Sequence, residues 1–172
     1  MGETLLTARK FTVERREYNI PGVGMVVRDL VVHPGAVLIV PVLSSGEVVL
    51  IRNFRYAAGQ KLLELPAGTL EPPEPPIKCA ARELEEETGY ITEALEPLCK
   101  FYTTPGFTDE FMHVFVSSGL TAKQQRLEAT EQIEVAVTSF DDALAATLDG
   151  RIIDAKTIAA LHIYNSTRRG TS

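Results

Sequence analysis

The segment from Gly68 to Tyr90, which reads GTLEPPEPPIKCAARELEEETGY, constrains the fold of this chain more than any other feature. It fits the spacing G-x5-E-x7-R-E-U-x-E-E-x-G-U, in which U is a bulky apolar residue. The fixed positions are Gly68, Glu74, Arg82, Glu83, Leu84, Glu86, Glu87, Gly89 and Tyr90. So many fixed positions rarely agree by chance within one short segment, which indicates that the segment has a chemical role as well as a structural one.

The same segment predicts one helix with a defined start and end. Pro75 and Pro76 suit a helix start, because proline tolerates the first turn and lacks only an amide hydrogen that would have no partner there. Gly89 suits the left-handed residue that ends a helix. Small and apolar residues recur at helical spacing and form the expected packing stripe. These residues are Ile77, Ala80, Ala81, Leu84 and Thr88.

The spacing of Glu83, Glu86 and Glu87 brings their carboxylates together on the face away from that stripe. Like charges at this spacing cost roughly 0.2–0.5 kcal/mol per pair on an isolated helix, which favours neutralisation by a cation. A hard oxygen site suits Mg²⁺, with Mn²⁺ as a possible substitute, and Arg82 can hold Glu86 in one rotamer. The alternative is a solvated acidic face that Lys78 and Arg82 balance.

This pattern resembles the Nudix box, the motif of hydrolases that split a nucleoside diphosphate linked to another group. The flanking stretches LPAG at 65–68 and PGFTDE at 105–110 resemble the ADP-ribose pyrophosphatase branch. The resemblance implies that the backbone carbonyl of Ala67 joins the metal sphere and that Glu110 contacts the substrate or a bridging water. Phe107 is a candidate for stacking on adenine, or else a core or interface residue. The alternative for Pro105-Gly106 is an ordinary turn.

Candidate phosphate ligands lie before the box, in the stretch Arg52-Asn53-Phe54-Arg55, which resembles the R-Q-x-R stretch of ADP-ribose pyrophosphatases. Arg55 matches the arginine that meets the diphosphate in those relatives, and its planar fork suits bidentate phosphate contact. Arg52 is either a second substrate contact or a surface charge. Arg28 lies in the region from which such relatives bind substrate across a dimer.

The predicted general base lies outside the helix, in the polar stretch between Ala122 and Glu131. The sequence from Glu131 to Val135 resembles the family stretch E-x-I-E-V, whose first glutamate activates or orients water, and Glu131 is the matching residue. Glu128 is the nearest competitor, Glu86 of the box could share the role, and an ordinary charged loop is the structural alternative.

Composition limits the partners of the chain. Lys and Arg number 17 against 23 Asp and Glu, so the formal net charge is −6. This balance argues against nonspecific nucleic-acid binding, whereas the resemblance to the Nudix family implies a small-molecule nucleotide as the partner. The two cysteines, Cys79 and Cys99, lack metal-site or C-x-x-C spacing, which favours reduced thiols in the cytoplasm. No apolar run reaches membrane-spanning length.

Hydrophobic patterning predicts an α/β (α+β) fold in a single domain, residues 1–172. Strands are expected at 4–18, 24–33, 36–43, 48–54, 95–102, 111–116 and 133–138, and helices at 139 to about 148 and 154 to about 169. A mixed sheet between helices fits the α/β/α sandwich of the Nudix family, with residues 34–172 as the catalytic core. Residues 1–33 form an N-terminal antiparallel strand extension, which by resemblance supplies a homodimer contact.

The resemblance implies metal-dependent hydrolysis of the pyrophosphate bond of ADP-ribose or a related nucleoside diphosphate sugar, giving AMP and a sugar phosphate. One alternative is a Nudix hydrolase of another nucleotide class, such as dinucleoside polyphosphates or GDP-mannose. The other is a non-catalytic nucleotide-binding module with the same fold. Such a module would be expected to lack a metal glutamate, and this chain has all of them.

Overall fold

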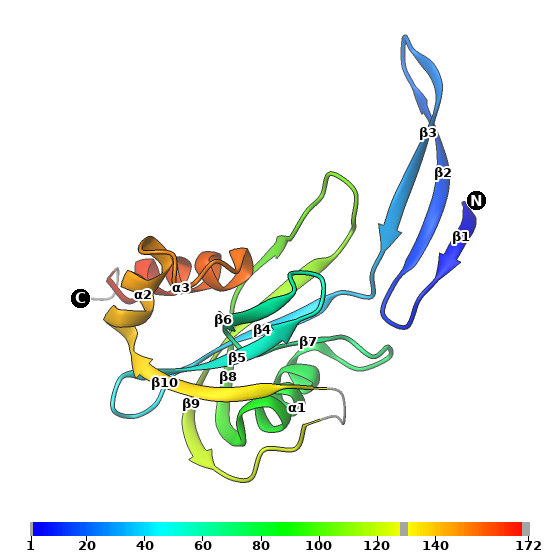
Figure 1. Cartoon of the computed structure of the whole chain (residues 1–172). Helices are drawn as coiled ribbons and strands as arrows, with labels where there is room; N and C mark the ends of the chain where they lie inside the picture. The colour runs from blue at the N-terminus through cyan, green and yellow to red at the C-terminus, as the bar shows by residue number, and fades with distance from the viewer. Residues whose placement is uncertain (1, 128–130, 170–172) are drawn as a thin grey trace.

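The chain folds into a layered body from which a narrow antiparallel sheet projects (Figure 1). The computed structural model describes residues 2–127 and 131–169. Its strands are β1 (Glu3–Thr7), β2 (Thr12–Ile20), β3 (Gly24–Val32), β4 (Ala36–Pro41), β5 (Glu47–Arg55), β6 (Gln60–Glu64), β7 (Ala67–Thr69), β8 (Tyr90–Tyr102), β9 (Phe111–Ala122) and β10 (Ile133–Ser139). Its helices are α1 (Pro76–Thr88), α2 (Phe140–Leu148) and α3 (Ala155–Arg169).

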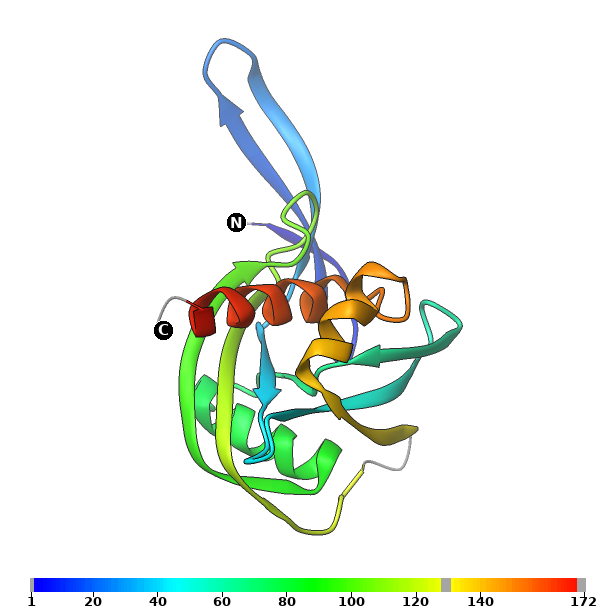
Figure 2. The same cartoon turned by 90° about the vertical axis from the view of Figure 1, so that its left-hand side faces the viewer.

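The body is a sandwich, with α1 on one side of the strands and α2 and α3 on the other (Figure 2). The sheet with the order β7-β4-β9-β8 is mixed, because β4 and β9 pair in parallel while β7 and β8 pair antiparallel to their neighbours. The predicted α/β/α sandwich is therefore confirmed. One detail differs, since β10, β5 and β6 form a separate antiparallel sheet and do not extend the mixed one.

Strand β4 is the centre of the core because it is apolar at almost every position. Leu38 and Val40 pack in the cluster that α2 and α3 cover, whereas Val37 and Ile39 pack in the cluster that α1 covers. Successive strand residues point to opposite faces, so a continuous apolar run is what a strand buried on both faces requires. All four side chains are fully buried, and the strand expected at 36–43 is present as Ala36–Pro41.

Helix α1 begins and ends where the sequence predicts. Pro75 is its N-cap, and Gly89 follows its last turn with φ 70°, donating its N–H to the carbonyl of Glu85 at 2.9 Å. The predicted packing stripe needs one correction, because Ile77 at the start of the helix is 43% exposed. The side chains that α1 buries are Cys79, Ala80, Leu84, Glu87 and Thr88. One box glutamate therefore lies on the buried side.

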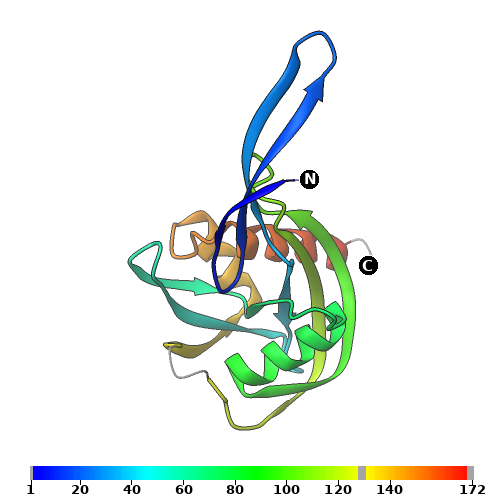
Figure 3. The same cartoon turned by 90° about the vertical axis from the view of Figure 1, so that its right-hand side faces the viewer.

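The strands β1, β2 and β3 form their own antiparallel sheet, which extends away from the sandwich (Figures 1 and 3). The single strand predicted over residues 4–18 was wrong. The chain reverses between Thr7 and Thr12, where Ala8 donates its N–H to the carbonyl of Phe11 at 2.9 Å. Neither Gly nor Pro occurs in this turn, so its usual signal is missing. The sheet exposes large apolar side chains, namely Leu5, Leu6, Phe11, Tyr18, Ile20, Val23, Met25 and Val27.

Two short strands, β6 and β7, were not predicted from the sequence. β7 carries the first glycine of the box and pairs with β4, which opposes Val37 to Gly68. Ser139 is the N-cap of α2, because its hydroxyl accepts the N–H of Asp142 at 3.1 Å. None of the helices in the described ranges combines the length and apolar character that a membrane crossing requires.

Candidate active site

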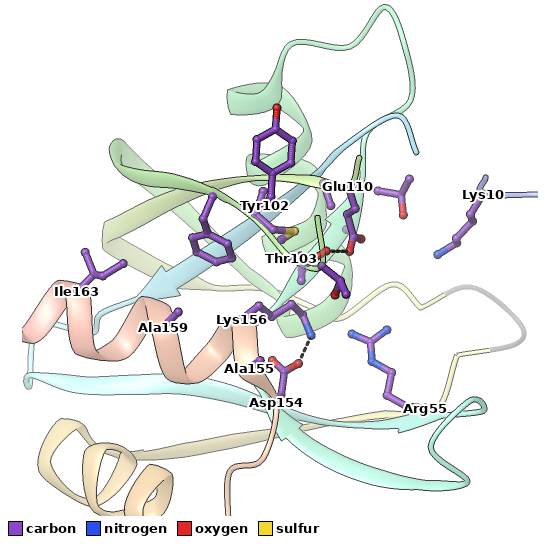
Figure 4. A pocket seen from close by; sticks show the side chains of 17 residues that line it. Lys10, Arg55, Tyr102, Thr103, Glu110, Asp154, Ala155, Lys156, Ala159 and Ile163 are labelled. Carbon is purple, nitrogen blue, oxygen red and sulfur yellow. Dashed lines mark hydrogen bonds and ion pairs between the residues drawn. The ribbon is translucent and has the colours of Figure 1, made fainter. Parts of the chain in front are cut away.

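Two adjoining cavities lie on the side of the sandwich nearest the N-terminal sheet. The smaller, of about 320 Å³, lies beside α1, and the larger, of about 680 Å³, lies beside α3. Figure 4 shows the larger one. The residues that line both are Lys10, Arg55, Ala67, Gly68 and Thr69. Because the two cavities share this wall, one elongated ligand can extend through both.

The smaller cavity collects most of the acidic residues that the sequence predicted for the site. Arg82, Glu83, Glu86 and Glu87 line it from α1, and Glu131 lines it from the segment before β10. Glu131 is far from α1 in the sequence, so its position here depends on the fold and not on local spacing. The competitor Glu128 lies outside the described residues.

Arg82 is hydrogen-bonded to three carboxylates of the box. Its Nε and Nη2 donate to the two oxygens of Glu74 at 3.1 and 3.0 Å. Its Nη1 donates to Glu83 at 2.7 Å and to Glu86 at 3.0 Å. The sequence predicted only the contact with Glu86. The bidentate pairing with Glu74 fixes the plane of the guanidinium, so Arg82 sets the rotamers of two predicted metal ligands at once.

Glu87 is a buried carboxylate at the floor of the smaller cavity, with only 3% of the residue exposed. Its Oε2 accepts the backbone N–H of Ala67 at 2.9 Å. Burial raises the pKa of Glu87 to about 8, and the Ala67 N–H and the charge of Arg55 oppose part of that rise. The carboxylate therefore lacks enough positive charge in its surroundings to stay ionised easily at neutral pH.

Glu83 also has too little positive charge around it to stay ionised as easily as an exposed carboxylate. Burial raises the pKa of Glu83, the charge of Arg82 opposes the rise, and the carboxylates of Glu86 and Glu131 add to it. A cation in the smaller cavity would favour the ionised form of both buried glutamates.

The residues of this cavity fit a hard divalent cation by the chemistry of their donors. The carboxylates of Glu83, Glu86 and Glu87 and the carbonyl of Ala67 offer only oxygen, the set that Mg²⁺ and Mn²⁺ prefer. Within residues 2–127 and 131–169, no three His, Cys, Asp or Glu side chains converge closely enough to hold a metal as they stand. Arg82 occupies Glu83 and Glu86, and the Ala67 N–H occupies Glu87.

The two predicted arginines of β5 lie on opposite faces of their sheet. Arg55 lines both cavities. Arg52 is exposed and lines a different hollow, of about 310 Å³, between β5, β10 and α2. The period of two along a strand explains the separation, since the two positions differ by an odd number. The structure therefore does not bring Arg52 to the predicted site, whereas Asn53 lines the smaller cavity.

Of the predicted substrate contacts Glu110, Phe107 and Arg28, only Glu110 lines one of the two cavities. Glu110 lines the larger cavity, where its carboxylate accepts the Thr103 hydroxyl at 2.6 Å. Phe107 is 55% exposed in the loop before β9 and lines neither cavity. Arg28 lies in the middle of β3 on the projecting sheet, opposite Arg16, and also lines neither cavity of its own chain.

Several residues of these cavities were not found from the sequence. Lys10 reaches both cavities from the turn between β1 and β2, and Asp154 and Lys156 reach the larger one from the start of α3 (Figure 4). Glu64 lies behind Arg55 and is completely buried. The available sequence signal was the position of Glu64 between Leu63 and Leu65, because a carboxylate that is buried among apolar residues requires a cationic partner.

The structure combines an α/β/α sandwich with a glutamate-rich helix, α1, that packs against the glycine-containing strand β7. These are the features expected of the family that the sequence resembles. Residues 32–161 match the family model described as the NUDIX domain. This match covers well over half of the chain, and the chain belongs to the NUDIX family.

Three curated relatives are similar to the chain over most of its length. An ADP-ribose pyrophosphatase of Bacillus subtilis is 40% identical over 78% of this chain and 74% of its own length. A methanol dehydrogenase activator of Bacillus methanolicus is 35% identical over 92% and 87%. An ADP-ribose pyrophosphatase of Mycobacterium tuberculosis is 34% identical over 98% and 83%.

The solved structures support the fold assignment. A crystal structure described as an ADP compounds hydrolase matches with a TM-score of 0.87 and 23% identity, covering 100% of this chain and 94% of that one. At that identity the likeness shows a shared fold.

Proposed function

We propose that this chain hydrolyses the pyrophosphate bond of ADP-ribose or a related nucleoside diphosphate sugar, giving AMP and a sugar phosphate. One observation carries the proposal: the box glutamates and Arg55 line adjoining cavities that share one wall. A diphosphate needs charge neutralisation at its centre and room for a group on each side. The similarity to two ADP-ribose pyrophosphatases supports the choice of substrate.

Glu83, Glu86, Glu87 and the carbonyl of Ala67 are the residues that would hold Mg²⁺, with Mn²⁺ as a substitute. When bound, such an ion polarises phosphoryl oxygens and lowers the pKa of a bound water. Arg82 keeps Glu83 and Glu86 in place through hydrogen bonds of 2.7 and 3.0 Å.

In this proposal Glu131 is the general base, because it faces the box glutamates from a separate segment. The water oxygen forms a bond to one phosphorus, and Glu131 accepts the proton of that water. The bridging P–O bond breaks and its electron pair stays on the leaving phosphate. Arg55 and Lys10 contact the phosphoryl oxygens from the shared wall and stabilise their charge. Glu110 contacts the part of the substrate that occupies the larger cavity.

The test is a hydrolysis panel in Mg²⁺ with ADP-ribose, ADP-glucose, GDP-mannose, NADH and diadenosine polyphosphates. We expect ADP-ribose to be cleaved fastest, and we expect Glu86→Gln or an excess of EDTA to abolish turnover. Fastest cleavage of GDP-mannose or a dinucleoside polyphosphate would move the protein to another substrate class. Tight binding of ADP-ribose without cleavage of any compound would identify a non-catalytic module.

We further propose that the protein is a cytoplasmic homodimer formed through the β1-β2-β3 sheet. This sheet exposes a row of large apolar side chains, and such a patch on a soluble surface is typical of an interface. In a dimer, Arg28 would reach the partner's substrate. Both free cysteines agree with a reducing compartment. Light scattering should give twice the chain mass for the wild type and the monomer mass for Val27→Glu.

A further inference from the structure

Glu64 is a fully buried carboxylate that accepts hydrogen bonds from two cationic side chains, Arg55 and Lys156. It ends β6 with 0% exposure. Its Oε1 and Oε2 accept Nε and Nη2 of Arg55 at 2.8 and 2.6 Å, and Oε2 also accepts Nζ of Lys156 at 2.7 Å. A buried charge is costly unless it is paired and hydrogen-bonded. The bidentate geometry also fixes the orientation of the guanidinium.

Lys156 is itself held in place at the start of α3. Its Nζ donates to Asp154 at 2.7 Å. Asp154 accepts the N–H and the hydroxyl of Thr157 at 3.0 and 2.6 Å, as an N-cap residue does. The Thr157 hydroxyl also accepts the backbone N–H of Leu65 at 2.9 Å. The first turn of α3 is therefore fastened to the end of β6, beside Glu64.

This arrangement leaves one edge of Arg55 available. Within the described residues, Nη1 of Arg55 has no hydrogen bond, whereas Nε and Nη2 are both used by Glu64. In Figure 4 the guanidinium extends from β5 into the space between Lys10 and the first turn of α3. Arg55 also lines the cavity of the box glutamates. Because Arg55 lines both cavities, its unused Nη1 is the donor that remains for a ligand there.

We propose that Glu64 is a positioning residue for substrate binding: with Lys156, it fixes the Arg55 fork so that the Nη1 edge faces the diphosphate. This inference rests on the proposed function for the identity of the anion. Lys156 donates to Oε2 of Glu64 from the start of α3, so Arg55 does not have to pair with the buried carboxylate alone. A contact that merely ties α3 to the sheet would stabilise the fold without affecting Arg55.

The experiment is a double-mutant cycle on the full-length chain with Glu64→Gln and Arg55→Ala. The readouts are kcat and KM for ADP-ribose and the calorimetric Kd of its non-hydrolysable α,β-methylene analogue in Mg²⁺. We expect each single variant to lower kcat/KM by roughly 10- to 100-fold, the range for a lost charge-assisted hydrogen bond. We expect the double variant to lose no more than Arg55→Ala alone, because Glu64 acts through Arg55.

Lys156 provides a second route that keeps the core carboxylate. Lys156→Met should raise the Kd of the analogue, and Lys156→Arg should restore it to within about threefold, as expected when a cation at this position is what matters. Glu134→Gln is the matched control, because Glu134 makes an exposed ion pair with Lys61 on the same sheet. This control should leave both constants unchanged.

Two outcomes would overturn the proposal. In the first, Glu64→Gln and Lys156→Met lower the melting temperature but leave kcat/KM and the analogue Kd within twofold of wild type. In the second, the losses of Glu64→Gln and Arg55→Ala multiply in the double variant. A wild type that binds the analogue but cleaves no substrate would contradict the proposed function while leaving this test intact through the Kd.

Discussion

The carboxylate of Glu83 lies directly against the backbone of Gly68. A Cβ placed on Gly68 would be 1.9 Å from Cδ of Glu83 and 2.0 Å from its Oε1. Both residues are held by the core, because Gly68 pairs with Val37 on β4 and Glu83 belongs to α1. Gly68 does not have the positive φ that favours glycine. The first glycine of the motif is therefore required by close approach and not by an unusual backbone conformation.

The substitution Gly68→Ala should displace Glu83 and lower kcat by at least about 100-fold, because misplacement of a reacting group by about 1 Å has a cost of this size. Circular dichroism should remain that of the wild type. Gly106→Ala is the control, since a Cβ there meets nothing within 4 Å and its φ is ordinary. A Gly68→Ala enzyme with unchanged kcat would show that the position of Glu83 is not important for turnover.

The fold was predictable wherever local chemistry decides structure. The apolar run of β4, the proline start of α1 and its glycine end are all local signals, and the structure confirms each one. The turn between β1 and β2 was missed because residues 8–11 contain no turn-forming residue. Its position depends on strand pairing in the projecting sheet, which is a tertiary effect that overrides local preference.

The site was predictable only in part, because some of its contacts depend on tertiary structure and not on local sequence patterns. Helical spacing was enough to group the box glutamates, and strand alternation could have separated Arg52 from Arg55. No local pattern links Glu64 to Lys156, because that contact joins residues 92 positions apart. Lys10 reaches the cavities through the missed turn. Residues that the fold brings together from distant segments have no common sequence spacing that could reveal them.

Replacing Arg82 by Lys should weaken metal binding more than catalysis. A lysine has one charged nitrogen and cannot bridge Glu74, Glu83 and Glu86 as the guanidinium does. We expect the Mg²⁺ concentration for half-maximal activity to rise about 10-fold or more, in line with losses of supporting contacts at metal sites, with kcat largely recovered at saturating Mg²⁺.

The control for Arg82→Lys is Arg126→Lys. Arg126, which follows β9, forms an ion pair at 3.1 Å with Glu85 of α1, the helix that carries Arg82. Neither Arg126 nor Glu85 lines either of the two cavities. This variant should have the wild-type Mg²⁺ dependence. An equal shift in both variants would mean that the general charge around α1, and not the Arg82 contacts, governs metal affinity.

The stability of the metal-free protein should fall as pH rises from about 5 to 8. The folded-state pKa of Glu87 is raised from 4.5 to about 8, so in this window the folded chain keeps a proton that the unfolded chain releases. This contribution to stability is complete below pH 4.5 and is lost through pH 8, with a slope of at most roughly 1.4 kcal/mol per pH unit. Urea unfolding in EDTA measures it.

Glu87→Gln should flatten that pH dependence and make the metal-free protein more stable than wild type at pH 8. The glutamine retains an acceptor for the Ala67 N–H but carries no charge to bury. Glu85→Gln serves as the comparison, since Glu85 lies on the same helix outside both cavities. If the slope between pH 5 and 8 persisted in Glu87→Gln, another group would have to be its source.

The identity of the general base can be decided by comparing Glu131→Gln with Glu128→Gln. Glu131 shares the smaller cavity with Glu83 and Glu86, so its replacement should lower kcat by about 10² to 10⁴, the usual contribution of a positioned base, while KM stays nearly constant. Glu128→Gln should have kcat within about twofold of wild type, because in this proposal Glu131 accepts the proton of the attacking water. A large loss in Glu128→Gln with full activity in Glu131→Gln would reverse the assignment.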